Sequence, residues 1–232
     1  MNASTSLEAT KEAVGSSAAP LPLRQRRQQE LRQQLSDVAT QMFLEHGFEA
    51  VRVADVARAC GVTEKTVFNH FPTKESLLSD RWDTTIQALR TKLAAPLTAP
   101  VDAALEVLET ELAFLMSSSR QPGSSLAQVS RFGALVRATP SLLAHQRGAL
   151  DRLCDAAAVV LAARSGSSPE DPEPLISAAA LTGLWTVFFH SLQRHLPSGD
   201  PSHIQAEVKR DLRRAAVVLR RGLENPLAAD SG

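Results

Sequence analysis

The sequence predicts an all-α protein of about nine helices. Along most of the 232 residues, apolar side chains recur at steps of three and four, the spacing of one buried helix face. Glycine, proline, serine and threonine fall between these runs, where helices begin and end. No segment shows the strict alternation of apolar and polar residues that indicates a half-buried strand.

Composition is that of an ordinary globular protein, with 44% hydrophobic and 22% charged residues. The 25 Lys+Arg equal the 25 Asp+Glu, which excludes a protein that coats nucleic acid through bulk charge. Two cysteines, Cys60 and Cys154, are too few for a disulfide framework and indicate reduced thiols. The N-terminus has no secretory pattern, and the apolar stretch from Ala178 to Phe189 is too short for a membrane span. We therefore expect a cytoplasmic protein without a membrane partner.

Residues 1–23 are rich in Ser, Ala and Thr and are expected to form a disordered N-terminal arm. A basic cluster of Arg24, Arg26 and Arg27 follows. The first helix is expected from Gln28 to His46, because its apolar stripe stops at a glycine.

Two short helices come next, at residues 53–60 and 63–71. Gly61 supplies a tight turn between them, and Thr63 can cap the second helix. Pro72 ends that helix.

Six further helices are expected in the rest of the chain. Their signals are Thr73 before and Pro96 after the fourth helix, Pro100 before the fifth, Gln121-Pro122-Gly123 after it, an apolar stripe from Leu126 to Val136, Thr139-Pro140 before the seventh, the polar loop Ser165–Glu173, an apolar helix from Leu175 to Leu196, and Asp200-Pro201 before the last.

The helix at residues 63–71 is the most specific feature. Val62, Val67 and Phe71 can turn inward together, which leaves a polar set outside: Thr63, Glu64, Lys65, Thr66, Phe68, Asn69 and His70. Such an exposed short helix suits the DNA major groove, where Asn pairs with adenine and Lys with guanine. The alternative is a solvated connector helix whose polar face has no function.

At these residues the sequence resembles the tetracycline-repressor (TetR) family of bacterial transcriptional regulators. The resemblance runs over GFEAVRVADVARACGVTEKTVFNHFPTKESLL and, with the helix before it, covers about a quarter of the chain. It implies a three-helix DNA-binding domain with a helix-turn-helix at residues 24–81. A helical ligand-binding and dimerisation domain is then expected at residues 82–232, although this part does not resemble one ligand class.

The resemblance also implies DNA contacts. Thr63 is expected to contact a phosphate through its hydroxyl and backbone N–H, and His70 a phosphate or the backbone. The expected base readers are Lys65, Thr66 and Asn69. Lys74, taken to lie at the start of the fourth helix, is expected to anchor a phosphate with help from the helix dipole.

Two positions depart from the family pattern. Phe68 stands where the family usually has Tyr, so apolar contact with a thymine methyl replaces a hydroxyl contact. Arg52 stands where the family often has a capping Thr, so we expect a phosphate contact and a missing capping bond. The Arg24–Arg27 cluster either reaches DNA from a flexible arm or is only a solvated flank.

Catalytic, metal and cofactor sites are not expected. The six histidines include no pair four residues apart with a nearby acid, and no phosphate-binding glycine loop or nucleophile elbow occurs. We therefore do not expect an enzyme. A helical enzyme or scaffold without DNA binding is the alternative from a different class.

The C-terminal aromatic residues suggest a cavity for an unknown small hydrophobic effector, with few polar groups. The candidate wall is Phe114, Met116, Phe132, Trp185, Phe188 and Phe189. Simple core packing is the alternative.

A homodimer is expected through the last two helices, because the helix at 175–196 is apolar on almost every side; Leu212 and Ala216 are expected at the interface. Two-fold symmetry would match a pseudo-palindromic DNA operator. The expected activity is a repressor released by the effector, with the fourth helix as the lever. An activator or an effector-independent regulator of the same fold is the alternative.

Overall fold

The computed structural model describes residues 22–78, 80–118 and 126–222. This part of the chain contains nine α-helices, two short 3-10 turns and no strand, which confirms the predicted all-α class. The elements are α1 (Leu23–His46), α2 (Val53–Ala59), α3 (Glu64–His70), η1 (Glu75–Leu78), α4 (Asp80–Ala94), α5 (Pro100–Ser118), α6 (Leu126–Ala138), α7 (Pro140–Ser165), α8 (Pro172–His195), η2 (Leu196–Ser198) and α9 (Pro201–Arg221). The predicted arm before residue 22, the Gln121-Pro122-Gly123 break and Leu223 lie outside the described residues.

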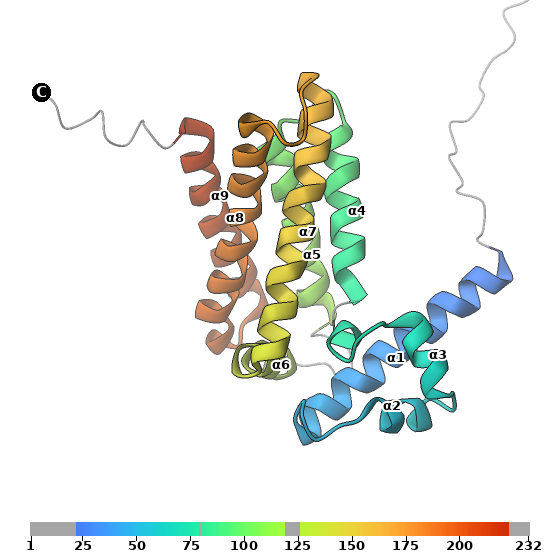
Figure 1. The fold of residues 1–232 in the computed structure, drawn as a ribbon. Coiled ribbons are helices and arrows are strands. Elements are labelled where there is room, and N and C mark those ends of the chain that lie inside the picture. The colour runs from blue at the N-terminus through green and yellow to red at the C-terminus, as the bar shows by residue number, and fades with distance from the viewer. Residues whose placement is uncertain (1–21, 79, 119–125, 223–232) are drawn as a thin grey trace, which may run out of the picture.

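The helices form two groups (Figure 1). Helices α4, α5, α7, α8 and α9 stand side by side as an upright bundle, in which α7 packs along α8 and α8 along α9. Helices α1, α2 and α3 and turn η1 form a smaller group at one end of the bundle. Each group has its own hydrophobic core.

The core of the small group is built from one face of each of its helices. Leu35, Ala39 and Phe43 of α1 meet Val56 and Ala57 of α2, and all are at most 2% exposed. Val67 in the middle of α3 and Phe71 directly after its last residue are both 1% exposed, and both face inward as the sequence predicted. Helices as short as α2 and α3 depend on this shared burial, because seven residues are too few for a stable isolated helix.

Glycine supplies two of the bends that shape this group. Gly47 ends α1 with a φ of +86°, and its N–H donates to the carbonyl of Phe43 at 3.0 Å. Gly61 turns the chain between α2 and α3 with a φ of +68°, a conformation that L-residues with a side chain rarely adopt. Both turns were predicted at these positions.

Two element boundaries differ from the prediction. Helix α1 begins at Leu23 rather than Gln28, so Arg24, Arg26 and Arg27 lie exposed on its first turns and not on a flexible arm. The segment expected to open the fourth helix at Thr73 is instead the separate turn η1.

Turn η1 is tightened by Thr73 and Ser76. The Thr73 hydroxyl accepts from the Ser76 N–H at 3.2 Å, and the Ser76 hydroxyl donates to the Thr73 carbonyl at 2.6 Å. These local bonds favour a 3-10 turn over the start of an α-helix.

The segment Pro172–Ser198, formed by α8 and η2, is long and apolar enough to cross a membrane by length and composition alone. It is longer than the Ala178–Phe189 stretch that the sequence drew attention to. In the fold it is a core helix, with Leu184, Trp185 and Phe188 at most 3% exposed. Its opposite face, which includes Leu175 and Ile176, lies on the surface.

Candidate nucleic-acid interface and ligand cavity

Helix α3 presents the predicted polar set outward. Thr63, Lys65 and Asn69 are exposed, Phe68 is 46% exposed, and Thr66 and His70 are half-buried. The inward residues Val67 and Phe71 hold the helix against α1 and α2, so the opposite face is free to enter a groove.

The N-terminus of α3 is capped as predicted. The Thr63 hydroxyl accepts from the Thr66 N–H at 3.1 Å, and the two threonine hydroxyls lie 2.9 Å apart. This bond satisfies one of the unpaired N–H groups that begin every helix. Both hydroxyls therefore lie at the end of α3 that a recognition helix directs toward the bases.

Arg52, the N-cap residue of α2, makes no side-chain capping bond, as expected, but Asp55 binds back to its N–H. Asp55 accepts from the Arg52 N–H at 3.1 Å, and this hydrogen bond is the main reason why the pKa of Asp55 lies below its ordinary value. The Arg52 guanidinium lies 3.5 Å from the same carboxylate and is 78% exposed. A carboxylate three residues into the helix has replaced the capping threonine.

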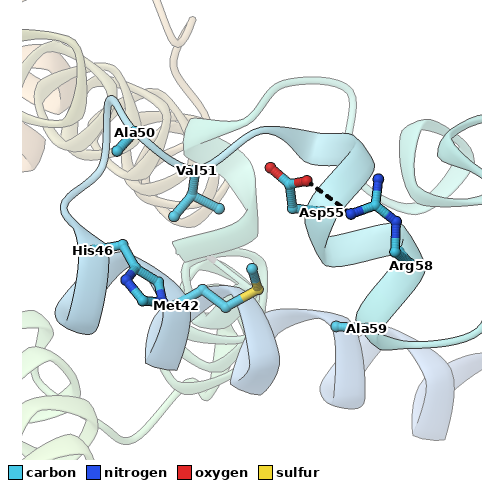
Figure 2. Close-up of a pocket in the computed structure, with 7 residues that line it drawn as sticks. All are labelled: Met42, His46, Ala50, Val51, Asp55, Arg58 and Ala59. Carbon is cyan, nitrogen blue, oxygen red and sulfur yellow. Dashed lines mark hydrogen bonds and ion pairs between the residues drawn. The ribbon is translucent and has the colours of Figure 1, made fainter.

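Asp55 also borders a shallow hollow of about 410 Å³ between the end of α1 and α2 (Figure 2). Figure 2 shows its ion pair with Arg58, at 3.3 Å, on one side of the hollow and Met42 and His46 on the other. The hollow contains none of the residues expected to contact DNA.

Lys74 lies in a different setting from the one expected. It precedes η1 and not an α-helix, since α4 begins only at Asp80, so the helix-dipole argument was wrong. Its Nζ lies 4.3 Å from the ring centroid of Phe48 and 5.7 Å from that of Phe43. These cation–π contacts hold the half-buried lysine beside the end of α1.

Sequence reasoning missed Arg32, which holds α3 in place. Its guanidinium lies 4.4 Å from the Phe71 ring centroid and donates to the His70 carbonyl at the end of α3. It also lies 3.9 Å from Asp83 of α4. The available signal was its place on the inward stripe of α1, three residues before Leu35.

A second hollow, a cavity of about 600 Å³, lies among α4, α5, α6, α7 and α8. Four of the six predicted wall residues line it, namely Phe132, Trp185, Phe188 and Phe189. Phe189 packs edge-on against Trp82 of α4, with ring centroids 6.0 Å apart, and Trp82 was not predicted as part of the wall.

Phe114 and Met116 are not among the lining residues. Phe114 is 45% exposed, and Met116 is 3% exposed within the packed core. Leu115 lines the cavity instead. Adjacent helical residues point about 100° apart, which explains why neighbours on α5 have three different environments.

Polar groups around the cavity are more numerous than we expected. They are Thr85, Glu111, Ser130, Arg137, Gln146, Arg147, Thr186, His190 and Gln193. Thr85 donates to the Glu111 carboxylate at 3.0 Å. The expectation of a wall with few polar groups was therefore wrong.

Helix α6 lies between this cavity and the small helical group. Phe132 and Val136 line the cavity, while Arg131 donates to the carbonyl of Leu44 in α1 at 2.7 Å. Leu135 and Val136 also pack against the core of the small group. One helix is thus in contact with both parts of the molecule.

The burial of α9 residues corrects the expectation that Leu212 and Ala216 lie at a dimer interface. Leu212 and Ala216 are at most 1% exposed within the single chain, so they belong to its own core and not to an interface. The apolar side chains that reach the surface of these two helices are Leu175, Ile176, Val217 and Val218.

Asp211 of α9 forms a polar cluster against α8. It accepts from the Ser191 hydroxyl at 2.8 Å and lies 3.3 Å from His195 Nε2 and 3.7 Å from Arg194. The Ser191 hydrogen bond, followed by the bond and charge of His195, lowers the pKa of this carboxyl.

The two cysteines are half-buried, and burial raises the pKa of both thiols, which disfavours the reactive thiolate. Among the described residues, no group of three or more His, Cys, Asp and Glu side chains could hold a metal ion.

Residues 35–80, which span most of the small helical group, match the profile of the bacterial regulatory proteins of the tetR family. Among curated relatives, MftR of Mycobacterium tuberculosis, proposed as the mycofactocin biosynthesis transcriptional regulator, is 25% identical over 150 residues, 65% of this chain and 73% of MftR. The HTH-type transcriptional regulator AcrR of Shigella flexneri is 36% identical over 55 residues, 24% of this chain and 26% of AcrR.

Solved structures extend the likeness in fold to the second group of helices. The complex of SmeT of Stenotrophomonas maltophilia with triclosan has a TM-score of 0.53 at 19% identity, covering 82% of this chain and 90% of SmeT. The fatty acid degradation regulator FadR of Bacillus halodurans has a TM-score of 0.52 at 15% identity, covering 79% and 97%. The helix-turn-helix and the profile match over residues 35–80 thus make the N-terminal part of the chain similar to the DNA-binding transcriptional regulators of the tetR family.

Proposed function

We propose that the chain is a homodimeric repressor that leaves a pseudo-palindromic operator when a small molecule with an apolar body enters the cavity. In this proposal residues 24–81 bind DNA, and residues 82–232 sense and dimerise. The protein acts in the cytoplasm on double-stranded DNA, with no membrane partner, cofactor or catalytic activity.

The observation that carries the proposal is the double contact of α6. Phe132 lines the cavity one residue after Arg131, which is bonded to α1. A ligand that displaces α6 therefore alters a contact with the helix that supports α3. An effector changes DNA affinity only if it binds one arrangement of the DNA-binding groups better than the other.

The proposed DNA contacts are the outward residues of α3 and its surroundings. Lys65, Thr66, Phe68 and Asn69 are proposed to contact bases in the major groove. Phosphate contacts are assigned to Arg52, Thr63, His70 and Lys74. Exposure of Lys65, Phe68 and Asn69 on one short helix supports this assignment.

The proposed dimer uses the exposed outer face of α8 and α9. Leu175 and Ile176 lie near the start of α8, and Val217 and Val218 near the end of α9, which runs back along α8. Pairing two copies across a two-fold axis would remove these side chains from water.

Aromatic walls support a ligand with an apolar body. Phe132, Trp185, Phe188 and Phe189 all face the cavity, and such walls are typical of small-molecule sites. SmeT, whose solved structure is a complex with triclosan, has the same fold.

The proposal is tested by selecting random DNA duplexes with the purified protein. We expect a palindrome whose half-site centres lie about 34 Å apart, one helical turn of DNA. Asn69→Ala should relax the preference at one position of each half-site. The matched control, Gln41→Ala, removes an amide from the exposed face of α1, where it bonds to Glu45 at 2.9 Å.

A reporter gene behind the selected palindrome then tests the direction of control. We expect lower transcription when the protein is present. Failure to select any sequence above non-specific binding, or increased transcription, would contradict the proposal of a repressor.

A further inference from the structure

We propose that the cavity takes an amphipathic organic anion, with its apolar body between the aromatic walls and its acidic group held by Arg137 and Arg147. This inference rests on the proposed function and names the chemical class of the effector. The acidic group is a carboxylate, sulfonate or phosphate, all of which arginine binds through paired N–H donors.

Both arginines belong to the cavity wall and not to the outer surface alone. Arg137 lies in the last turn of α6 and Arg147 two turns into α7, and both line the cavity. Val136, directly before Arg137 on α6, and Leu143, four residues before Arg147 on α7, also line it. An anion held there would have an apolar chamber beside it.

Gly133, which has no side chain, leaves room for the Arg137 guanidinium. Arg137 Nη1 lies 3.2 Å from the point where a Cβ on Gly133 would stand, and Gly133 also lines the cavity. The guanidinium therefore folds back along α6 over a residue with no side chain. A Cβ at position 133 would push the guanidinium away by a few tenths of an ångström, since 3.2 Å is closer than ordinary van der Waals contact.

Neither arginine has an acidic partner in the described part of the chain, where no carboxylate oxygen lies within 4.0 Å of Arg137 or Arg147. This differs from Arg52 and Arg58, which share Asp55, and from Arg194, which lies beside Asp211. The guanidinium groups of the wall thus keep their donors for a ligand.

Glu111, the one carboxylate among the described residues that line the cavity, does not cancel the positive charge of the two arginines. Glu111 is on α5, whereas the arginines come from α6 and α7, and it already accepts a hydrogen bond from the Thr85 hydroxyl. Two guanidinium groups against one carboxylate leave the lining with a net positive charge. A cationic ligand would be repelled by the positive charge of both arginines. A neutral ligand without an acceptor would leave the guanidinium N–H groups hydrogen-bonded to water only.

Two probes with the same apolar body test the inference: 1-anilinonaphthalene-8-sulfonate, an anion, and N-phenyl-1-naphthylamine, which lacks the sulfonate. Both fluoresce in apolar sites. The only two tryptophans of the chain, Trp82 and Trp185, line the cavity, so energy transfer from tryptophan reports binding there. Trp185→Phe should reduce that transfer.

We expect the intact protein to bind the sulfonate probe about tenfold more tightly than the neutral probe, the usual effect of a hydrogen bond to a charged group. Arg137→Gln and Arg147→Gln should each remove most of that difference and leave binding of the neutral probe unchanged. Arg152→Gln is the matched control. It removes an arginine of α7 that bonds to the carbonyl of Gly148 at 3.3 Å and does not line the cavity.

Equal affinity for the two probes, or arginine variants that bind the sulfonate probe as the intact protein does, would overturn the inference while leaving the proposed repressor intact. An equal loss of sulfonate binding in Arg152→Gln would also overturn it, since bulk charge would then explain the preference. If neither probe receives energy from tryptophan, the cavity itself fails as a ligand site. Selection of the palindrome is measured separately and would still report on DNA binding.

Discussion

Arg32 is expected to decide whether α3 is held firmly enough to read DNA, and Arg32→Ala tests this directly. The substitution removes a hydrogen bond to the His70 carbonyl, a cation over the Phe71 ring and a neighbour of Asp83. All three contacts end on α3 or on the residues that follow it. The predicted result is a fold that persists with a loosened recognition helix.

The magnitude follows from the three contacts. A hydrogen bond from a charged donor contributes about 1.5–3 kcal/mol, and a partly shielded cation–π contact about 0.5–2 kcal/mol. The Asp83 side chain is 77% exposed, so water screens that pair and it adds about 0–1 kcal/mol. Because one guanidinium makes all three contacts, the terms are not additive, and we expect a loss of about 2–3 kcal/mol.

The measurement is amide hydrogen exchange in α3 together with urea unfolding. The Phe71 N–H, bonded to the Val67 carbonyl at 2.8 Å, should exchange roughly 30–150-fold faster if 2–3 kcal/mol of local stability is lost. Arg26→Ala is the control, since Arg26 is exposed on the same helix. If the two variants exchange alike, Arg32 does not hold α3 and the reasoning is wrong.

Three further outcomes are expected. Asn69→Ala should cost about 1–3 kcal/mol of operator binding at one base pair, measured by fluorescence anisotropy with substituted duplexes; an equal loss at every position would contradict base readout. Ile176→Glu should give a folded monomer in sedimentation, whereas Leu212→Glu should unfold the chain, because Leu212 is 1% exposed in its own core. The lowered pKa of Asp211 means that its charged form stabilises the fold at neutral pH, a contribution lost as the pH falls from about 4 through the folded pKa. Asp211→Asn should therefore lower Tm at pH 7 and flatten its acid dependence, and an unchanged profile would contradict the role of this cluster.

The helix-turn-helix could be predicted from sequence because its signals are local. Gly61 fixes a turn that needs positive φ, Thr63 provides a cap, and Val67 with Phe71 marks the buried side of a very short helix. Each signal acts within a few residues of its own position. No knowledge of the rest of the fold was needed to place the exposed face of α3.

The start of α1 could not be found in the same way. The segment from Leu23 to Gln28 is LRQRRQ, whose arginine and glutamine residues are good helix formers. All of it is exposed in the structure, so it has no buried stripe for periodicity to detect. Helix propensity alone extends α1 here, and the basic cluster becomes part of a rigid element.

The cavity wall was predicted in part for a related reason. Helical spacing identifies which residues point inward, but Met116 in the packed core and Phe132 at the cavity are both inward-facing. Only the relative placement of α4 to α8 decides which inward residue meets empty space. The arginines of the wall were missed because long charged side chains count as surface in a periodicity argument, although both line the cavity and the Arg137 guanidinium folds back over Gly133.

The structure also indicates which contacts would pass the effect of ligand binding in the cavity to the DNA-binding helices. The sequence favoured the fourth helix as the lever, since it is continuous with both parts of the chain. In the fold, two helices that line the cavity contact α1 or its side chains: α4 through Asp83 and Arg32, and α6 through Arg131 and the Leu44 carbonyl.

These two contacts meet α1 at different points along its length. Arg32 lies in its first half and also holds the end of α3, whereas Leu44 lies in its last turn, next to the bend that leads to α2. A displacement of α4 relative to α6 would therefore tilt α1 rather than slide it. Because α3 packs on α1 through Phe71, such a tilt changes the direction of the recognition helix, which in a dimer alters the spacing of the two copies on DNA.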